Sequence, residues 1–588
     1  MVFVIFLMDL WPNRWLVFGY DLPYLFIAEW NQLKQFYPDF YWVIFSMARF
    51  IRFGVPLLLV AIPLLTEQHR TSVLRLVKRT WKSPTKGLTK LLAVPILVDM
   101  LFTACCYFLL KNEVHDPLRF QLHLARSFLL ISVGHLLLLA GFNWNRVKKG
   151  ALQFLFPNVA PHALAVFRIL FFGYLTIIFI WGFGNDAHLI GTLEKQSLPG
   201  IGWLIEITPV NPTLYTIACI MGGLFSLLSA IGYRTRLFMI LNTVCVFYVV
   251  ATPNFFGKLW HHQIIIWITW ILAVSPCADV WSLDAKLGRA KANDANSGYG
   301  FHLRMIWLHL GLIYFFAGFH KLWVAGFDWA LADTVVNLIT IEWFEHYDKI
   351  AWPRVDRFPT LIKVGALFTI MFELSYLFLL LKKRWRWLAI GGGLLMHNLL
   401  GHFMYITFFA TLQVFYMVYV PWNWILEKLN ILKEVEMPQV PRPRWLSAAL
   451  SIPVLIFCMN LLYGVFRINS YPFSVYPTYT DVVPDTMTYF DYRVLDKGKE
   501  QLDFRVEGKR HHFRWENYSR LEYAIINEFQ REGVLDTAAV RTMWRRWQLE
   551  VPPLAEVDSV DVFVKYRFLS PDSSRIPLEP LYLMTIKK

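Results

Sequence analysis

Charged side chains are scarce in this chain. Of its 588 residues only 17% are charged, whereas 56% are hydrophobic and 17% are aromatic, and the mean hydropathy is +0.42. This composition is too apolar for one soluble fold, so we expect a polytopic membrane protein in a lipid bilayer. Acidic residues are scarcer than basic ones, which gives a net charge of +15. Because Lys and Arg gather in short loops between apolar runs, the excess is typical of membrane loops, and we expect no nucleic-acid partner.

Cysteine pairs are also lacking. None of the six cysteines forms a CxxC pair, and all lie within or beside apolar runs. We therefore expect core residues, and neither a disulfide framework nor a cysteine metal site. The segment His397-Asn398-Leu399-Leu400-Gly401-His402 is similar to one histidine box of the di-iron desaturases, but their HxxHH boxes are missing. We predict no metal site.

A secretory leader is not expected either. Met1 to Trp30 carries charges among aromatic residues and lacks a basic start, a clean apolar core and a small-residue cleavage site. We expect an interfacial or re-entrant amphipathic segment there, and an additional span is the alternative.

Long apolar runs are what the sequence has in abundance. Runs of roughly 18 to 25 residues match the thickness of a bilayer and predict about twelve transmembrane helices. They lie near 42–66, 91–111, 121–142, 161–183, 212–231, 237–253, 261–280, 301–324, 361–382, 387–402, 403–421 and 445–467. Basic loops alternate with less basic ones between these runs, which predicts that the basic loops are cytoplasmic.

The composition changes after the last apolar run. The chain is polar beyond Arg467, with alternating segments at 501–506 and 560–568 and helix-like segments near 519–532 and 537–548. This pattern predicts a C-terminal α+β domain. By the count of spans it lies on the exoplasmic side, in the periplasm, the extracellular space or an organelle lumen.

These observations divide the chain into three parts. We expect an N-terminal membrane segment over 1–155, with the interfacial helix and about three spans. The main transmembrane domain is expected over 156–470, and the exoplasmic α+β domain over 471–588. The fold class is thus a polytopic α-helical membrane protein with a C-terminal exoplasmic α+β domain.

A lysine with a histidine beside it stands near the end of the apolar run 301–324. His320 and Lys321 follow the apolar stretch Phe315-Phe316-Ala317-Gly318-Phe319. An ionisable group at this depth is rare unless it faces an internal cavity, and desolvation favours the neutral amine. Lys321 is therefore a candidate base, and a side chain that snorkels to the outer interface is the alternative.

Further polar residues are expected at the same exoplasmic depth. His261 and His262 begin one predicted helix, and His397, with Asn398 beside it, lies near the outer end of another. Three helices would thus bring a lysine and imidazoles to one level, which is the pattern of a pocket. Each histidine taken alone is also typical of an interfacial or hydrogen-bonded core residue.

An acidic residue interrupts the run 361–382. Glu373 lies near its middle, where a charge is costly enough that the side chain should be paired or protonated. We expect either a proton partner for the candidate base or a structural partner for an arginine such as Arg168.

Several short motifs occur in a fixed order between about 160 and 480. They are Phe167-Arg168-Ile169-Leu170-Phe171, Ala230-Ile231-Gly232-Tyr233-Arg234, Trp260-His261-His262, Asp279-Val280-Trp281-Ser282-Leu283-Asp284, Tyr314-Phe315-Phe316-Ala317-Gly318-Phe319-His320-Lys321-Leu322 and Met396-His397-Asn398. In order and spacing they resemble the vitamin K-dependent γ-glutamyl carboxylase family and its microbial relatives, which share the horizontally transferred transmembrane (HTTM) domain.

The resemblance implies a site and a chemistry. Lys321 matches the lysine regarded in that family as the base that deprotonates vitamin K hydroquinone, or another reduced naphthoquinone. Oxygen and carbon dioxide are the co-substrates, and a glutamate in a protein or peptide is carboxylated. His262 and His397 match histidines of the quinone site, where they would hydrogen-bond quinone oxygens and stabilise oxyanion charge, and His261, His320 and Asn398 lie beside matched positions.

Two functions from different classes follow. The first is a vitamin K-dependent carboxylase-like enzyme, a carbon-carbon lyase that couples oxidation of a reduced quinone to its epoxide with carboxylation of an exoplasmic glutamate. The alternative is a non-carboxylating quinone- or lipid-binding membrane protein that acts as a maturation or export factor for a secreted peptide. Transport is not favoured, because the ionisable residues gather at the outer side and do not follow a path through the bilayer.

Overall fold

The computed structural model describes most of the chain after residue 120. The described residues are 121–133 in part, 144–181 except 158, 183, 207–254, 262–290, 297–345, 350–381, 385–406, 413–431, 448–468, 471–473, 479–496, 500–503, 525, 529, 535–550, 557, 559–569 and 581–587. The expected N-terminal interfacial segment, the spans near 42–66 and 91–111, and His261 lie outside them.

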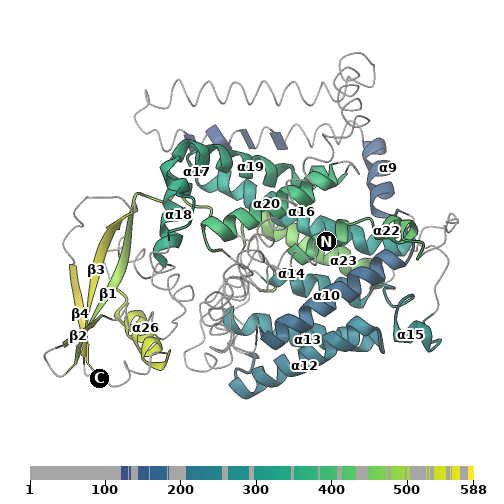
Figure 1. Ribbon diagram of the computed structural model, residues 1–588, viewed down its shortest axis with the longest axis horizontal. Coiled ribbons are helices and arrows are strands. Elements are labelled where there is room, and N and C mark those ends of the chain that lie inside the picture. Colours follow the sequence, from purple (N-terminus) through teal and green to yellow (C-terminus); the bar gives the residue numbers. More distant parts are fainter. Residues whose placement is uncertain are drawn as a thin grey trace, which may run out of the picture.

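Most of the described residues belong to helices, arranged as a bundle (Figure 1). Five helices there are long and apolar enough to cross a membrane, and they lie within α10, α12, α13, α16 and α19. The count of about twelve spans stays a prediction. The main helices are α9 (Trp144–Leu155), α10 (His162–Trp181), α12 (Pro212–Ile231), α13 (Thr235–Asn254), α14 (Gln263–Ala273), α16 (Ser297–Val324), α19 (Pro359–Leu381), α20 (Arg386–Phe403) and α23 (Ala448–Val465).

Helix α12 shows how local sequence sets helix ends. The Asn211 side chain accepts hydrogen bonds from the backbone N–H of Thr213 and Leu214, which satisfies donors that have no intrahelical partner. Pro212 follows at the first helical position, where its missing N–H costs nothing. The helix ends at Gly232, whose φ of 73° is the left-handed conformation typical of a C-terminal glycine.

The predicted span over 403–421 is described only in part. Its described residues include the end of α20 and a 3-10 helix, η4 (Gln413–Tyr419), all seven residues of which are buried. Non-α backbone is tolerated at membrane depth where protein surrounds it and not lipid. Helix α14 is also shorter than the apolar run 261–280, because the chain turns at Ser275 and Pro276 after Ala273.

Short helices complete the membrane region. They are α15 (Leu283–Lys286), α17 (Asp328–Leu331), α18 (Thr334–Glu345), η3 (Val355–Arg357) and α22 (Trp422–Lys428). At one side of the bundle, α17 and α18 follow the end of α16. The indole N–H of Trp329 in α17 donates to the Tyr479 carbonyl at 2.6 Å, and the side-chain amide of Asn337 in α18 donates to the Val483 carbonyl at 3.0 Å. These contacts tie the chain beyond α23 back to the bundle.

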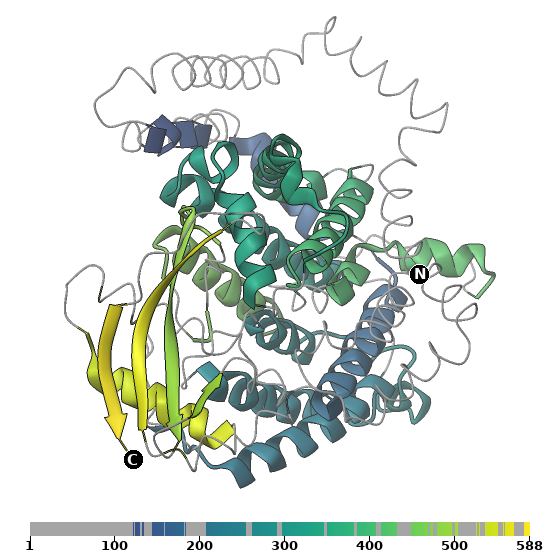
Figure 2. The ribbon, with the colours of Figure 1, turned by 60° about the vertical axis from the view of Figure 1, so that its left-hand side comes forward.

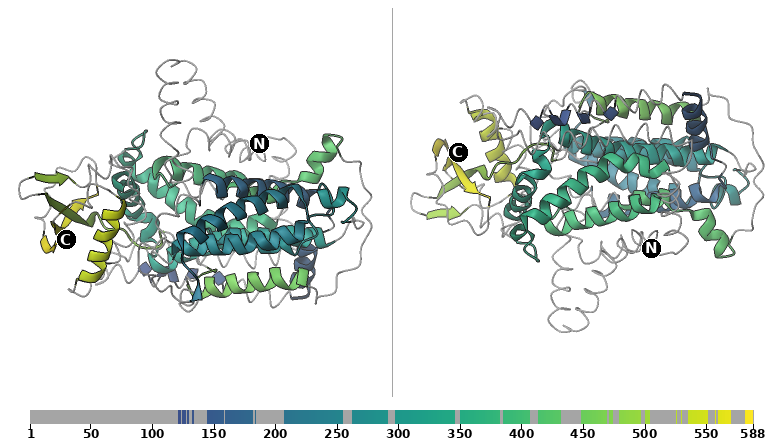
Figure 3. Two further views of the ribbon diagram at one scale, coloured as in Figure 1. Left: turned by 90° about the horizontal axis from the view of Figure 1, so that it is seen from below. Right: turned by 90° about the horizontal axis from the view of Figure 1, so that it is seen from above.

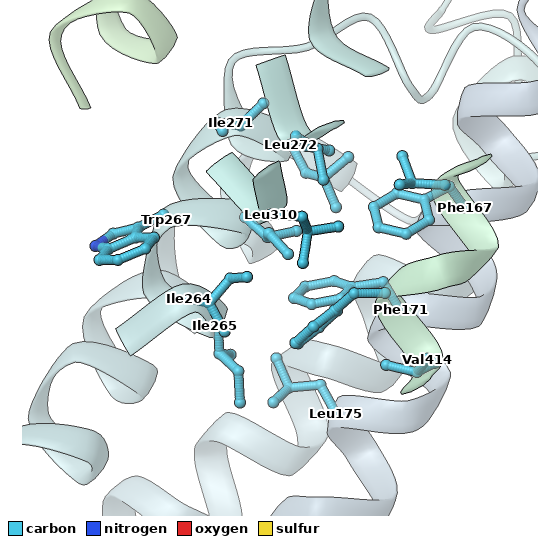
Figure 4. Close-up of a cluster of buried hydrophobic side chains, with 14 of the residues drawn as sticks. Phe167, Phe171, Leu175, Ile264, Ile265, Trp267, Ile271, Leu272, Leu310 and Val414 are labelled. Carbon is cyan, nitrogen blue, oxygen red and sulfur yellow. The ribbon is translucent and has the colours of Figure 1, made fainter. Parts of the chain in front are cut away.

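The bundle core is apolar and aromatic. Phe167, Phe171 and Leu175 of α10 face Ile264, Ile265 and Leu272 of α14, with Leu310 of α16 and Val414 of η4 closing the cluster (Figure 4). Burial of such side chains stabilises each by roughly 1.5–3 kcal/mol relative to exposure to water.

The described C-terminal residues form an antiparallel sheet with a helix. Strands β1 (Thr486–Asp496), β2 (Glu500–Asp503), β3 (Ser559–Phe568) and β4 (Leu581–Lys587) lie in the order β2-β1-β3-β4. Helix α26 (Thr537–Glu550) covers one face of it (Figure 2), where Val540, Met543 and Trp544 pack on valines of β3. The strand β3 and the helix α26 lie where the sequence predicts a strand over 560–568 and a helix over 537–548.

The sheet and the helix α9 mark opposite ends of the bundle. In Figures 1 and 3 the sheet lies beyond α17 and α18, whereas α9, α15 and α22 lie at the far end. Helix α9 runs across that end and not along the bundle axis. Its exposed face carries Lys148 and Lys149. This placement is typical of a helix at a membrane interface.

Candidate functional site

Two helices cross closely at a glycine, and the crossing positions a buried ion pair. A Cβ placed on Gly318 of α16 would lie 2.8 Å from the Glu373 Cβ and 3.1 Å from the Leu374 backbone nitrogen of α19. Only a residue without a side chain permits this approach, as at close helix contacts in membranes. One turn beyond Gly318, Lys321 donates from Nζ to both carboxylate oxygens of Glu373, each at 2.8 Å.

Both members of the pair are withdrawn from solvent. Lys321 is 6% exposed and Glu373 is 5% exposed. The Lys321 side chain therefore points into the protein and does not snorkel to the outer interface. Its Nζ also lies 5.1 Å from the Trp329 ring centroid, a distance at which the ring attracts a cation. An amine and a carboxylate in this contact neutralise each other's charge away from solvent.

A group of tyrosines lies beside the pair. Tyr314, two turns before Lys321 on α16, shares a hydrogen bond of 2.5 Å between its hydroxyl and Nε2 of His397. The same hydroxyl is hydrogen-bonded to the hydroxyl of Tyr416 in η4. The Tyr314 ring stacks on Tyr376 of α19 with ring centroids 4.0 Å apart. Four separate elements thus meet at the Tyr314 side chain.

Glycines of α20 admit two of these aromatic side chains. A Cβ on Gly393 would overlap the Tyr416 hydroxyl, and one on Gly392 would lie 2.6 Å from the Phe372 ring. Phe372 precedes Glu373, and its ring lies edge-on to Tyr314 with ring centroids 6.1 Å apart. The tandem glycines therefore let α20 approach η4 and α19 closely, which places His397 against Tyr314.

An amide pair extends the polar group along α20. Gln413 donates from Nε2 to the Asn398 Oδ1 at 3.2 Å, and both side chains are buried. The Gln413 Oε1 is buried without a hydrogen-bond partner among the described residues. A buried amide oxygen in that state is a ready acceptor for a ligand hydroxyl.

The other predicted site residues lie elsewhere. The His320 ring hydrogen-bonds through Nε2 to the Gly464 carbonyl of α23 at 2.9 Å and stacks on Phe316, so it faces a different helix from Lys321. His262 precedes α14 and lies edge-on to Phe183, with ring centroids 6.1 Å apart. In the part of the chain that the structure describes, Lys321 has no hydrogen bond or ion pair with either histidine.

Arg168 is not the partner of Glu373. Its Nη1 donates to the Cys277 carbonyl at 2.7 Å and its Nη2 donates to the Trp281 carbonyl. Trp281 and Ser282 belong to the loop before α15, and a Cβ on Gly232 would overlap the Ser282 side chain. Arg168 thus holds this loop against α10 and the turn between α12 and α13. The expectation of an Arg168–Glu373 pair fails because Arg168 bonds to loop carbonyls, whereas Glu373 lies against α16.

Asp284 completes this loop anchor from the other side. Its carboxylate accepts from the backbone N–H of Arg234 at 2.9 Å and from the N–H and hydroxyl of Thr235, both at 2.7 Å. Burial alone would raise the pKa of Asp284, but the hydrogen bonds from Thr235 and Arg234 and the charge of Arg289 outweigh it and hold that pKa below its ordinary value. The motifs at 167–171, 230–234 and 279–284 therefore build a structural anchor remote from Lys321.

The comparison with known families bears on this region. Residues 156–424 match the HTTM domain. The HTTM domain is characteristic of the vitamin K-dependent carboxylase family, and here it extends from just before α10 into α22. It contains the Lys321–Glu373 pair, the Tyr314–His397 contact and the Arg168 anchor. No curated protein and no solved structure matches the chain.

Some residues at this site cannot be recognised as site residues from the sequence alone. Tyr416 and Gln413 lie in an apolar run that predicts a span, and only the buried 3-10 helix brings them against His397 and Asn398 of α20. The sequence does place Tyr314 on the same helix face as Lys321. The two residues are seven positions apart, and seven residues make nearly two full turns of an α-helix. No group of three metal-ligand side chains occurs among the described residues.

Proposed function

We propose that this protein is a vitamin K-dependent carboxylase-like membrane enzyme that acts on a glutamate-containing protein or peptide at the exoplasmic side. The HTTM domain supports the class, and the buried Lys321–Glu373 pair is the observation that carries the proposal. A charge pair at this depth costs desolvation free energy and is retained chiefly where function needs it.

The residues around the pair fit a reduced naphthoquinone. A flat ring with two hydroxyl groups needs aromatic walls and buried acceptors. Phe372, Tyr376 and Trp329 supply aromatic surface, and the Gln413 Oε1 supplies an acceptor without a partner among the described residues. When bound with oxygen, such a quinol supplies the strong base that removes the glutamate γ-hydrogen before carbon dioxide adds.

The chain's own part in this chemistry is to hold and receive a proton. With Nζ as the ammonium, a proton that arrives at the pair is taken by a Glu373 carboxylate oxygen, and the ammonium remains to stabilise negative charge nearby. Lys321 and Glu373 then act together as the base, which refines the expectation that Lys321 acts alone. The hydrogen bond between Tyr314 and His397 fixes both side chains beside the ligand ring, and the aromatic walls exclude water.

A quinol oxidation assay tests the proposal. Purified protein in lipid nanodiscs is given vitamin K hydroquinone and oxygen, and epoxide is measured by chromatography. We expect Lys321→Ala and Glu373→Gln each to lower the rate at least about 100-fold, the scale of a lost acid-base group. Lys363→Ala is the matched control, because Lys363 of α19, which is partly exposed, pairs with the exposed Asp333 at 3.0 Å. Mass spectrometry for a carbon dioxide adduct on glutamate then tests carboxylation.

The ion pair also favours a second function. A lysine held by a carboxylate at 2.8 Å is already satisfied, as expected of a site that binds a quinone or lipid without reacting. Such a protein would serve as a maturation or export factor for a secreted peptide. Under this alternative the parent protein binds the quinone, detected by quenching of tryptophan fluorescence, but forms no epoxide.

A further inference from the structure

Two guanidinium groups lie over one indole ring at the end of the bundle remote from the sheet. The Cζ atoms of Arg304 and Arg386 are 3.6 Å and 4.6 Å from the ring centroid of Trp307. Arg304 and Trp307 belong to α16, and Arg386 is the first residue of α20. The indole N–H of Trp307 donates to the Val418 carbonyl at 2.8 Å, so the ring is a fixed platform for both cations.

Among the described residues, these cations have no carboxylate that neutralises them. Arg386 donates from Nε to the Leu380 carbonyl at 3.0 Å, and no carboxylate among the described residues forms an ion pair with Arg304 or Arg386. The Arg304 Nη1 is buried with no hydrogen-bond acceptor in the described part of the chain. A guanidinium stays charged in a protein, so the two groups repel each other and their burial is unfavourable until an anion approaches.

The depth of this arginine pair matches a lipid head group. Arg304 precedes Lys321 by seventeen positions on α16, which corresponds to about 25 Å along the helix axis. That length is close to the ~30 Å hydrocarbon core, so with α16 across the bilayer and Lys321 near one surface, as the sequence predicts, Arg304 lies near the other surface. Helix α9 crosses the bundle at the same end (Figure 1), and its Phe154 ring centroid is 4.9 Å from the Arg304 Cζ.

We propose that Arg304 and Arg386 bind the phosphate of an anionic phospholipid. Guanidinium groups match phosphate oxygens with paired, charge-assisted hydrogen bonds. Phe378 and Leu381, in the last turns of α19, are 41% and 50% exposed and give acyl chains an apolar surface beside the head group. The exposed Lys148 and Lys149 of α9 add positive charge at this surface. This phosphate site is independent of the proposed carboxylase reaction.

Thermal unfolding in detergent tests the phosphate site. The purified protein is titrated with dioleoyl phosphatidylglycerol, with dioleoyl phosphatidylcholine, and separately with inorganic phosphate. We expect phosphatidylglycerol to raise Tm at lower concentrations than phosphatidylcholine, and inorganic phosphate to leave Tm unchanged. Arg304→Gln and Arg386→Gln should each raise the phosphatidylglycerol concentration needed for half the shift about tenfold.

Arg289→Gln is the matched control. Arg289 also lies over an aromatic ring, 5.6 Å from the Tyr233 centroid, but its Nη1 is 3.9 Å from a carboxylate oxygen of Asp284. This variant should respond to phosphatidylglycerol as the parent does. Equal responses to the two lipids, or unchanged titrations in both arginine variants, would overturn the proposal. An equal effect of inorganic phosphate would show a free-anion site and overturn the assignment to lipid. If neither variant folds, native mass spectrometry of the parent decides, and absence of retained phosphatidylglycerol refutes the site.

Discussion

Lys321 and Glu373 are in contact across the crossing of α16 and α19, with Nζ 2.8 Å from each carboxylate oxygen. The two residues are 52 positions apart in sequence, and both side chains are buried. Each would be a costly isolated charge, and together they form a neutral unit. Its stability and its chemistry therefore depend on both members.

Removal of one partner should destabilise the protein more than removal of both. Glu373→Leu leaves a buried ammonium without a counter-charge and should lower the free energy of unfolding by about 3 kcal/mol or more. Lys321→Met should act similarly by isolating the carboxylate. The double variant Lys321→Met/Glu373→Leu should lie within about 1 kcal/mol of the parent, because an apolar pair replaces the charges. A double-mutant cycle from reversible unfolding in detergent measures this coupling, and additive single effects would contradict the ion pair.

The helix crossing depends on Gly318. Gly318→Ala places a Cβ 2.8 Å from the Glu373 Cβ, so α16 and α19 must separate. We expect a loss of about 1–3 kcal/mol, the usual cost of overpacking, together with a lower rate of quinol oxidation. Gly365→Ala on α19 is the control, since nothing lies within 4 Å of the added Cβ. Its better helix propensity should leave Tm unchanged or slightly higher. Equal Tm values for the two variants would argue against a close crossing at Gly318.

The loop anchor depends on Gly232 for two separate reasons. Its φ is +73°, and an added Cβ would also overlap the Ser282 side chain. Gly288 has a similar φ of +69° but open space around it. Gly288→Ala should therefore cost only the left-handed strain of about 1–2 kcal/mol, and Gly232→Ala should cost more. Chemical denaturation of both variants separates strain from steric overlap, and equal costs would contradict the packing of Ser282 on Gly232.

Asp284 should make the anchor sensitive to acid. Its pKa is below the ordinary value in the folded protein, so the anchor's contribution is fully present above the unfolded pKa of about 3.9. That contribution is lost as pH falls through the lower folded pKa, because a protonated carboxyl no longer accepts all three hydrogen bonds. Asp284→Asn should lower Tm at pH 7 and reduce the dependence of Tm on pH below about 4. The parent and the variant should differ least at the lowest pH measured, and a constant difference would show that Asp284 does not titrate there.

Sequence periodicity and composition predict the positions of several helices of the bundle. The apolar runs near 212–231 and 361–382 correspond to α12 and α19 because a helix must satisfy its own backbone groups in lipid. Over 403–421 the apolar run predicts a span, whereas Gln413–Tyr419 form the buried 3-10 helix η4, and hydropathy alone does not distinguish these two structures. Lys321 and Glu373 stood out because each is a charge where charge is costly. The predicted depth of His397 and the family resemblance identify it as a candidate site residue. The sequence does not predict its contact with Tyr314.

The sequence by itself indicated a membrane protein, located its long apolar helices, and showed that Lys321 and Glu373 need partners. The tertiary structure decided that they are each other's partners, that Arg168 instead holds a loop, and that Tyr416 reaches Tyr314 beside His397. The physical reason is that helical periodicity gives the face on which a residue lies but not the neighbouring helix. The neighbours follow from where backbones approach closely, at Gly318 between α16 and α19 and at Gly393 between α20 and η4.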